Sequence, residues 1–220
     1  MATRLVDLSV PIFHEMPIWS GEPKTGIVNY FKIGREAGDA EIMNMKLLSM
    51  CGHAGTHTDA PYHLVDDGAT LDDLDIARWC GPARVLRFAD HPEGQDVSIA
   101  DVESRAPELS PGARLLFHFG WDRHLGTSHY FDREALPKLS VDLMRWLNDK
   151  AVGLVGVDTP SVNPHLDRHV AIFESESPPV VVELLTRLGD IPDDITLIAL
   201  PLKIREGDGS PVRAVAVIEE

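Results

Sequence analysis

The sequence predicts an α/β or α+β fold with a mixed β-sheet core, formed as a single compact domain over residues 1–220. Apolar segments typical of strands outnumber the helical segments, and the two types alternate along the chain. No internal repeat or low-complexity linker divides the chain. Hydrophobic residues make up 44% and charged residues 25% of the sequence, which is ordinary for a globular protein.

Eight segments have the composition of strands. Some are continuous apolar runs, typical of buried strands, whereas Met43, Met45 and Leu47 alternate at period two. The last two segments are joined by a connection that contains REGDGS, which favours a hairpin. The eight segments are residues 5–10, 26–33, 41–50, 85–88, 115–119, 152–157, 195–202 and 212–218.

Four segments have helical features. A helix is predicted over residues 140–148, because Ser140 can cap its N-terminus and apolar residues recur at helical spacing. Residues 98–104 begin with a serine and carry acidic residues in the first turns, as a helix N-terminus should. Weaker patterns predict short helices within residues 70–79 and 182–188.

The composition disfavours nucleic-acid and membrane partners. Asp and Glu total 35 against 20 Lys and Arg, which gives a formal net charge of -15 that repels a phosphate backbone. No stretch approaches the roughly 18 apolar residues of a membrane span. The opening MATRLVDLSVPIFHEMP lacks the uninterrupted apolar segment of a signal peptide. We therefore expect a cytoplasmic enzyme with a small-molecule substrate.

The two cysteines, Cys51 and Cys80, do not belong to a CxxC pair. A disulfide framework or a thiolate zinc site is therefore not expected. We interpret both residues as small buried thiols of a protein in a reducing compartment.

The residues that carry chemistry are concentrated in the segment CGHAGTHTDAPYHL, residues 51–64. His53, His57, Asp59 and His63 fall within eleven residues, all at odd positions that share one face of an extended chain. His57 and Asp59 are two residues apart, or about 6.6 Å in a strand, which suits a shared metal ion. The cluster therefore predicts a metal site.

A shared ion also requires the chain to bend inside this segment. His53 and His57 would be about 13 Å apart if the chain were fully extended. Gly55 permits a bend, and the glycines and Pro61 make a helix improbable. Imidazole and carboxylate ligands favour a catalytic ion, which can activate water, over a structural ion. The alternative is that these are ordinary turn and packing residues.

The segment HAGTHTDAPYH resembles the HxGTHxDxPxH signature of the cyclase family, which includes kynurenine formamidase-like and isatin hydrolase-like metal-dependent hydrolases. The segments DLSVPIFHEMPIWSGEP, FGWD, VGVDTPSV and LIALPLKI resemble the N-terminal strand and later strand ends of that family. The resemblance implies a swivelling β/β/α type of α/β fold with a mixed sheet. It also implies one or two divalent ions per subunit, Zn²⁺ or Mn²⁺, and a homodimer or homotetramer.

The resemblance further implies roles for individual residues. By their positions in the signature, His53, His57 and Asp59 would be metal ligands, and Asp59 would bridge if two ions bind. His63 would be the catalytic general acid and base. Glu183 in VVVELL would be a further metal ligand, because it precedes LGDIP as the glutamate of the family precedes a similar turn.

Two more residues are assigned on the same resemblance. Trp19 in MPIWSG matches an aromatic residue that lines the substrate pocket. A second downstream histidine ligand is expected about twelve residues before Glu183, where this chain has Ala171. His169, two residues earlier, is our candidate for that ligand.

Together these features predict a metal-dependent hydrolase that uses metal-activated water. Its substrate would be a small amide, either an aryl formamide such as N-formylkynurenine or a cyclic amide such as isatin. Two alternatives stay open: a lactone hydrolase or cyclase/dehydratase that uses the same metal site, and a non-catalytic metal- or ligand-binding module. A requirement for His63 in turnover but not in metal binding would distinguish an enzyme from a binding module.

Overall fold

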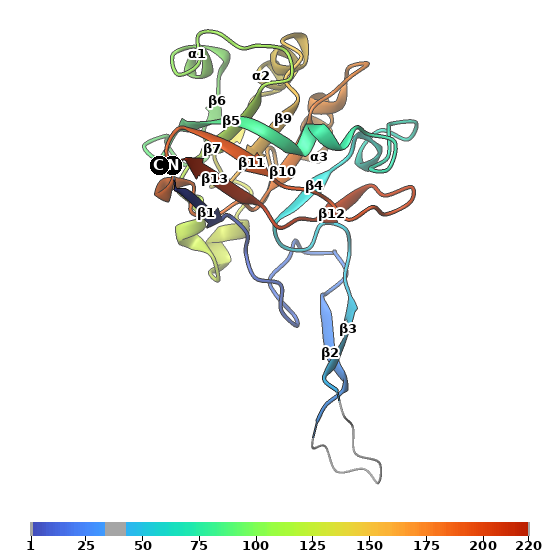
Figure 1. Cartoon of the computed structure of the whole chain (residues 1–220). Helices are drawn as coiled ribbons and strands as arrows, with labels where there is room; N and C mark the ends of the chain where they lie inside the picture. Colours follow the sequence, from blue (N-terminus) through green and yellow to red (C-terminus); the bar gives the residue numbers. More distant parts are fainter. Residues whose placement is uncertain (1, 34–42, 220) are drawn as a thin grey trace.

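The computed structural model describes residues 2–33 and 43–219, and its main feature is a nine-stranded mixed sheet. In spatial order the strands are β1 (Thr3–Asp7), β13 (Val215–Glu219), β11 (Asp194–Ile198), β5 (Cys80–Arg87), β7 (Arg114–His118), β9 (Leu154–Val157), β10 (Val180–Glu183), β4 (His57–Asp59) and β12 (Gly209–Pro211). The neighbours β5, β7, β9 and β10 run parallel, and the strands on either side pair antiparallel (Figure 1). The predicted α/β fold with a mixed sheet is confirmed.

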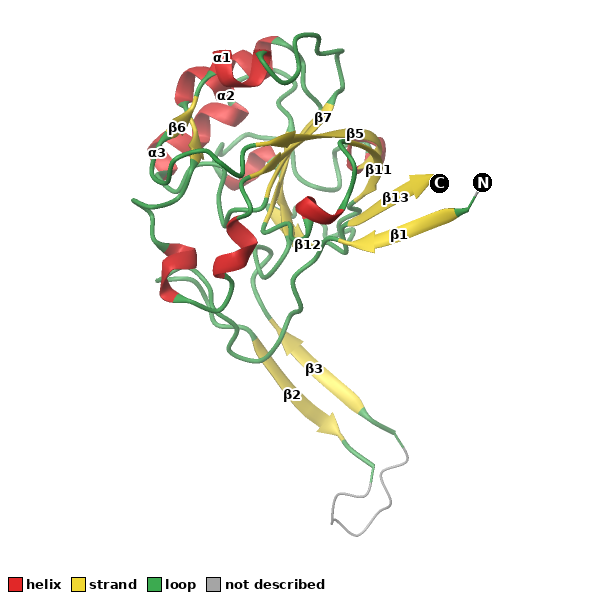
Figure 2. Cartoon of the chain, turned by 90° about the vertical axis from the view of Figure 1, so that its left-hand side faces the viewer, coloured by secondary structure: helices red, strands yellow, loops and turns green. Residues whose placement is uncertain are grey.

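Apolar side chains fill both faces of this sheet. Leu115 belongs to one buried cluster and Leu116 to another, as expected for successive residues of a strand covered on both sides. The cluster with Leu115 includes residues of α1 (Ile99–Glu103) and α2 (Val141–Asp149), which lie close together in Figure 2. Among the described residues, no helix is long and apolar enough to cross a membrane.

Both predicted α-helices with a serine cap are confirmed. Ser98 accepts a hydrogen bond from the backbone N–H of Asp101, whose carboxylate accepts one from the Ser98 N–H, so the two residues form a capping box. Ser140 Oγ accepts from the backbone N–H of Leu143 at 3.1 Å and begins α2.

Of the two weaker helix predictions, the one within residues 70–79 is confirmed as a short 3₁₀-helix, and the one over residues 182–188 is wrong. Residues 182–188 do not form a helix, because the run of valines before Glu183 continues as strand β10 between β9 and β4. Its β-branched residues are buried on both faces, which favours a strand. Within residues 70–79 the regular structure is the 3₁₀-helix Ile76–Trp79, with Asp75 as its cap.

The two cysteines are less buried than expected. Cys80 is exposed at the start of β5 and Cys51 is half-buried, so neither is a fully buried thiol. Both are free thiols.

The predicted C-terminal hairpin is modified by an extra strand. Strands β11 and β13 pair antiparallel as predicted, with Thr196 opposite Val217. The connection between them also forms β12, which crosses to the other edge of the sheet and pairs with β4. The segment that contains REGDGS is thereby brought next to His57 and Asp59.

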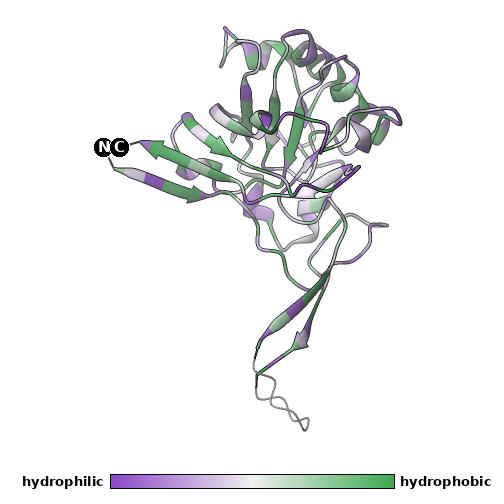
Figure 3. Ribbon diagram, turned by 45° about the vertical axis from the view of Figure 1, so that its right-hand side comes forward, coloured by the Kyte–Doolittle hydropathy of each residue, from purple (hydrophilic) through white to green (hydrophobic). Residues whose placement is uncertain are grey.

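A second hairpin projects from the sheet (Figures 1 and 2). It consists of β2 (Gly26–Phe31) and β3 (Met45–Ser49), and residues 34–42 between them lie outside the described residues, as do positions 41 and 42 of the predicted strand 41–50. Neighbouring residues such as Leu47 and Leu48 are both exposed, so alternation does not produce a buried face here. Figure 3 shows hydrophobic residues along this hairpin.

Two short strands complete the fold. Strands β6 (Asp96–Val97) and β8 (Lys138–Leu139) form a small parallel pair next to α1 and α2 in the sequence.

Candidate functional site

A cavity at β4 and β10 brings the predicted site residues together. The following predicted residues line it: Trp19, His53, His57, Asp59, His63, His169 and Glu183. They come from the segment between β1 and β2, from the loop before β4, from β4 and the following 3₁₀-helix Pro61–His63, from β10, and from α3 (Leu166–His169). The site therefore depends on segments that are far apart in the sequence.

The bend expected between His53 and His57 is formed at Gly55. Its φ is +68°, a left-handed conformation that side chains other than glycine rarely adopt. A Cβ at this position would also lie 3.0 Å from the Ile12 side chain. The carbonyl of Gly55 accepts a hydrogen bond from His57 Nδ1 at 2.8 Å. Because a carbonyl can only accept, Nδ1 carries the proton and Nε2 of a neutral His57 has the free lone pair.

Strand pairing places Glu183 beside His57. The two residues are directly opposite in the antiparallel pair of β10 with β4, and His57 Nε2 lies 3.6 Å from Glu183 Oε2. The other carboxylate oxygen of Glu183 accepts a hydrogen bond from the backbone N–H of Val162 at 2.8 Å. Burial and the nearby Asp59 raise the pKa of Glu183 well above its ordinary value.

Asp59 lies at the centre of the cluster. Its Oδ1 is 2.8 Å from His53 Nδ1 and 3.2 Å from His57 Nε2, and its side chain is 1% exposed. Burial favours the protonated form, but His57 and His53 hold the pKa of Asp59 well below its ordinary value. In turn, hydrogen bonds to Asp59 and Asp208 outweigh the effect of burial and raise the pKa of His53 to about 10.

His169 also faces this centre, although it stands two residues before the expected position. Its Nε2 lies 4.0 Å from Asp59 Oδ2 and 3.9 Å from Glu183 Oε1. This nitrogen is buried and has no hydrogen-bond partner in the part of the chain that the structure describes. Burial lowers the pKa of His169 to about 4, so its ring is neutral near pH 7. Ala171 lies in the following 3₁₀-helix and does not line the cavity.

The remaining predicted residues are less enclosed. The ring centroid of His63 lies 4.0 Å from that of His53, and its side chain is 26% exposed. Burial lowers the pKa of His63. Trp19 donates from Nε1 to the carbonyl of Pro160 at 3.3 Å and contacts Phe131 edge to face, with centroids 5.1 Å apart. Phe131 also lines the cavity.

These donor groups fit a divalent cation. Two sets of three residues each have ligand atoms within 4.8 Å of one another: His53, His57 and Asp59, and Asp59, His169 and Glu183. Asp59 belongs to both sets. Two buried carboxylates and an unpartnered buried imidazole nitrogen would leave an unfavourable excess of acceptors, which a cation would satisfy. Nitrogen and oxygen ligands of this kind suit Zn²⁺ and Mn²⁺.

Sequence reasoning missed two acidic residues at the site. Asp208 Oδ2 lies 3.0 Å from His53 Nε2, and Glu22 lines the cavity. Burial raises the pKa of Glu22. Asp208 precedes Gly209 in a turn-rich segment, where an aspartate is common for conformational reasons alone. Asp208 lies near the histidines because the adjacent strand β12 pairs with β4, and the sequence gives no sign of this pairing.

A second group of possible ligands lies outside the residues that line this cavity. His129 Nε2 is 3.2 Å from Glu93 Oε2, and His124 Nε2 is 3.8 Å from Glu93 Oε1. These groups are partly exposed, and Arg123 Nε donates to His124 Nε2 at 3.0 Å.

The chain is similar to known proteins in sequence and in fold. The family model described as "Putative cyclase" matches residues 6–164. Kynurenine formamidase of Bacillus cereus is 34% identical over 215 residues, which cover 96% of this chain and 95% of that protein. Isatin hydrolase A from Labrenzia aggregata bound to benzyl benzoate superposes with a TM-score of 0.84 at 22% identity and covers 99% and 94% of the two chains. A predicted metal-dependent hydrolase from Bacillus stearothermophilus has a TM-score of 0.73 at 23% identity and covers 99% of both chains. These solved structures share the fold.

Proposed function

The chain belongs to the cyclase family, and from this premise we propose that it is a metal-dependent hydrolase that cleaves the C–N bond of a small amide. One observation carries the proposal: three imidazoles and two carboxylates converge in one cavity, at donor distances that suit a divalent ion. An aryl formamide such as N-formylkynurenine is the first candidate substrate, because the relative with that activity in its name aligns over 96% of this chain. A cyclic amide such as isatin is the second.

We propose His53, His57, Asp59, His169 and Glu183 as the metal ligands. Asp59 would bridge two ions, because it belongs to both donor sets, whereas one ion would use a subset of these residues. When bound, a divalent ion polarises the substrate carbonyl and makes water a better nucleophile near neutral pH. Zn²⁺ and Mn²⁺ are both compatible with these donors, so the proposal covers one or two ions of either metal.

His63 is the proposed general acid and base. Its ring lines the cavity with its centroid 4.0 Å from that of His53, and its Nδ1 lies 3.7 Å from Asp208 Oδ2. Burial lowers its pKa, so a neutral imidazole that can accept a proton is available near pH 7. Hydrolysis of an amide needs a proton removed from water and a proton delivered to the leaving nitrogen, and one histidine can perform both transfers.

Trp19 is proposed to bind the aromatic part of the substrate. Trp19 contacts Phe131 edge to face, and Leu166 and Leu184 also line the cavity, so part of its lining is apolar. Such a lining suits a planar aryl ring whose amide group reaches the metal ligands.

Metal analysis and a substrate screen test the proposal. The purified protein should contain Zn²⁺ or Mn²⁺, or bind either ion when it is added, and should hydrolyse N-formylkynurenine or isatin. Because Glu93 and His129 belong to a separate group of possible ligands, the metal content of His129→Ala should be measured in parallel. Protein that neither contains nor binds these ions would refute the proposal.

The screen also separates the alternative functions. Turnover of simple lactones, with no hydrolysis of either amide, would identify a lactone hydrolase or cyclase. Metal binding without turnover of any of these compounds would favour a non-catalytic binding module.

We further propose a homodimer or homotetramer. Support comes from the projecting hairpin, where large apolar side chains such as Val28, Tyr30 and Leu48 are about half exposed or more. Exposed apolar groups at this density are typical of surfaces that a partner covers. Light scattering of the wild type and of Tyr30→Lys would test the role of the hairpin: the variant should dissociate, and a monomeric wild type would contradict the proposal.

A cytoplasmic location is part of the same proposal. It is supported by the free thiols of Cys51 and Cys80, because reducing compartments keep thiols in this state. Recovery of the protein in an extracytoplasmic fraction of fractionated cells would contradict it.

A further inference from the structure

Asp208 is held against the histidines by backbone packing. Its carbonyl accepts a hydrogen bond from the backbone N–H of Ala60 at 2.9 Å, so it is tied to the chain directly after Asp59. The next residue, Gly209, contacts the ring of His53 so closely that a Cβ there would lie 2.5 Å from an atom of this ring. The loop thus fits against His53 with no space for a side chain at position 209.

The ring of His53 is bound by a carboxylate at each nitrogen. Nδ1 lies 2.8 Å from Asp59 Oδ1, and Nε2 lies 3.0 Å from Asp208 Oδ2. Nδ1 thus contacts a carboxylate of the donor set that also contains His57, whereas Nε2 contacts Asp208, which is outside that set. Ligand histidines commonly donate their second ring N–H to a carboxylate, which fixes the tautomer and orients the ring.

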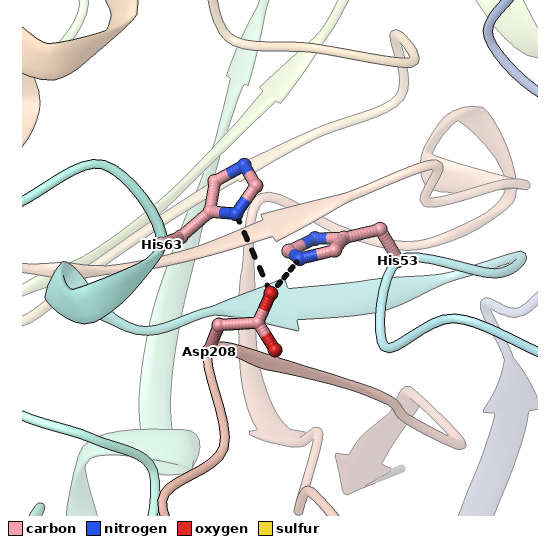
Figure 4. A group of neighbouring side chains, drawn as sticks. All are labelled: His53, His63 and Asp208. Carbon is pink, nitrogen blue, oxygen red and sulfur yellow. Dashed lines mark hydrogen bonds and ion pairs between the residues drawn. The ribbon is translucent and has the colours of Figure 1, made fainter. Parts of the chain in front are cut away.

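The same carboxylate oxygen also approaches His63. Asp208 Oδ2 lies 3.7 Å from His63 Nδ1, and the rings of His53 and His63 lie 4.0 Å apart. Figure 4 shows the Asp208 side chain directed between the two rings. One carboxylate therefore contacts both a proposed metal ligand and the proposed proton carrier.

We propose that Asp208 is a positioning residue that orients His53 for metal binding and His63 for proton transfer. This inference rests on the proposed function. An alternative is that Asp208 is itself a metal ligand with His53 and His63, since the ligand atoms of these three residues also lie within 4.8 Å of one another.

The test compares Asp208→Ala and Asp208→Asn with Glu206→Gln. Glu206 is in the same loop, its side chain is 78% exposed, and its substitution removes the same charge without a contact to the histidines. Metal affinity is measured by competition with a chromogenic chelator for Zn²⁺ and for Mn²⁺, and the number of bound ions by elemental analysis. The kcat and KM of the loaded proteins are measured over a range of pH.

A positioning role gives a defined pattern. Asp208→Ala should bind the same number of ions with roughly 10- to 100-fold weaker affinity. Its kcat should fall with little change in KM, and the pH dependence of kcat should shift from that of the wild type. Asp208→Asn keeps an oxygen that can accept from His53 and should restore part of the affinity, whereas Glu206→Gln should match the wild type.

Two results would overturn the inference. The loss of one bound ion in both Asp208 variants would identify a ligand instead, and wild-type affinity together with an unchanged kcat and pH profile would exclude a positioning role. If the wild type itself binds no ion, the proposed function fails, and this outcome is distinguishable from both.

Discussion

Glu183 lies directly opposite His57 across the antiparallel pair of β10 and β4, so both side chains project from the same face of the sheet. The carboxylate is thus delivered to the imidazole by strand register rather than by a flexible loop. The Val162 N–H, which donates to Glu183 Oε1 at 2.8 Å, fixes it further. Rigid elements of this kind are suited to hold a metal site in a defined geometry.

This relationship predicts that Glu183→Gln weakens metal binding. The amide oxygen can still accept from the Val162 N–H, so the fold should be retained, but the anionic ligand is lost. Affinity measured by chelator competition should fall by at least about 10-fold, the range found for altered partners of metal sites. Glu22→Gln is the matched control, because Glu22 lines the same cavity outside the proposed donor sets. Equal affinities of Glu183→Gln and the wild type would exclude Glu183 as a ligand.

A stronger effect is expected at Asp59, because its carboxylate belongs to both donor sets. Asp59→Ala should lose bound metal, and elemental analysis of the purified variant would show this directly. The substitution also removes the carboxylate that lies 3.2 Å from Nε2 of the buried His57. Asp67→Asn, at an exposed position, is the control that changes the same charge elsewhere. If Asp59→Ala retains the full metal content, the proposed centre is wrong.

His63 should behave differently from the ligands. His63→Ala is expected to keep its metal and to lose roughly 10²- to 10⁴-fold in kcat, the contribution typical of a positioned general acid and base. Parallel elemental analysis and steady-state kinetics on the best amide substrate would measure both properties. Tyr62→Phe, at the exposed neighbouring residue, serves as the control. Normal hydrolysis by His63→Ala would remove this residue from the mechanism.

The part of the site between His53 and His63 could be predicted from the sequence because its residues are close together along the chain. The residues from His53 to His63 share one short segment, and the bend at Gly55 follows from the distance its flanking histidines must cover. The resemblance identifies Glu183 but not its element. A short apolar run with one charge does not distinguish a buried strand from a helix, and the structure has strand β10 there.

The remaining contacts depend on long-range packing. His169 reaches the centre because α3 directs it there, and the spacing of the family motif places the histidine two residues later. Asp208 joins His53 only through the strand β12, which has no pattern of its own in three residues. The alternation in residues 43–47 predicts a strand, and β3 is one, but its side chains are exposed and do not pack against a core within the described residues.

A buried carboxylate outside the donor sets predicts a pH-dependent stability. Asp158 is fully buried and accepts backbone hydrogen bonds from Phe119, Gly120 and Trp121 at 3.0, 2.7 and 3.3 Å. Burial outweighs these bonds and raises its pKa from 3.8 to about 7. The folded state therefore holds this proton more tightly than the unfolded state, so its contribution to stability is largest at low pH and falls as pH rises towards 7.

Comparison of the wild type with Asp158→Asn isolates this contribution, because an amide does not titrate. Asparagine can accept only some of the three hydrogen bonds, so the variant should be less stable by about 1–3 kcal/mol at pH 5. The stability advantage of the wild type should then decrease by about 1.4 kcal/mol per pH unit near pH 5 and by roughly half as much near pH 7. Urea unfolding of both proteins in chelator, at half-unit pH intervals, would measure the difference. An advantage that stays constant or grows with pH would show that Asp158 is ionised throughout, and that its three N–H donors outweigh the effect of burial.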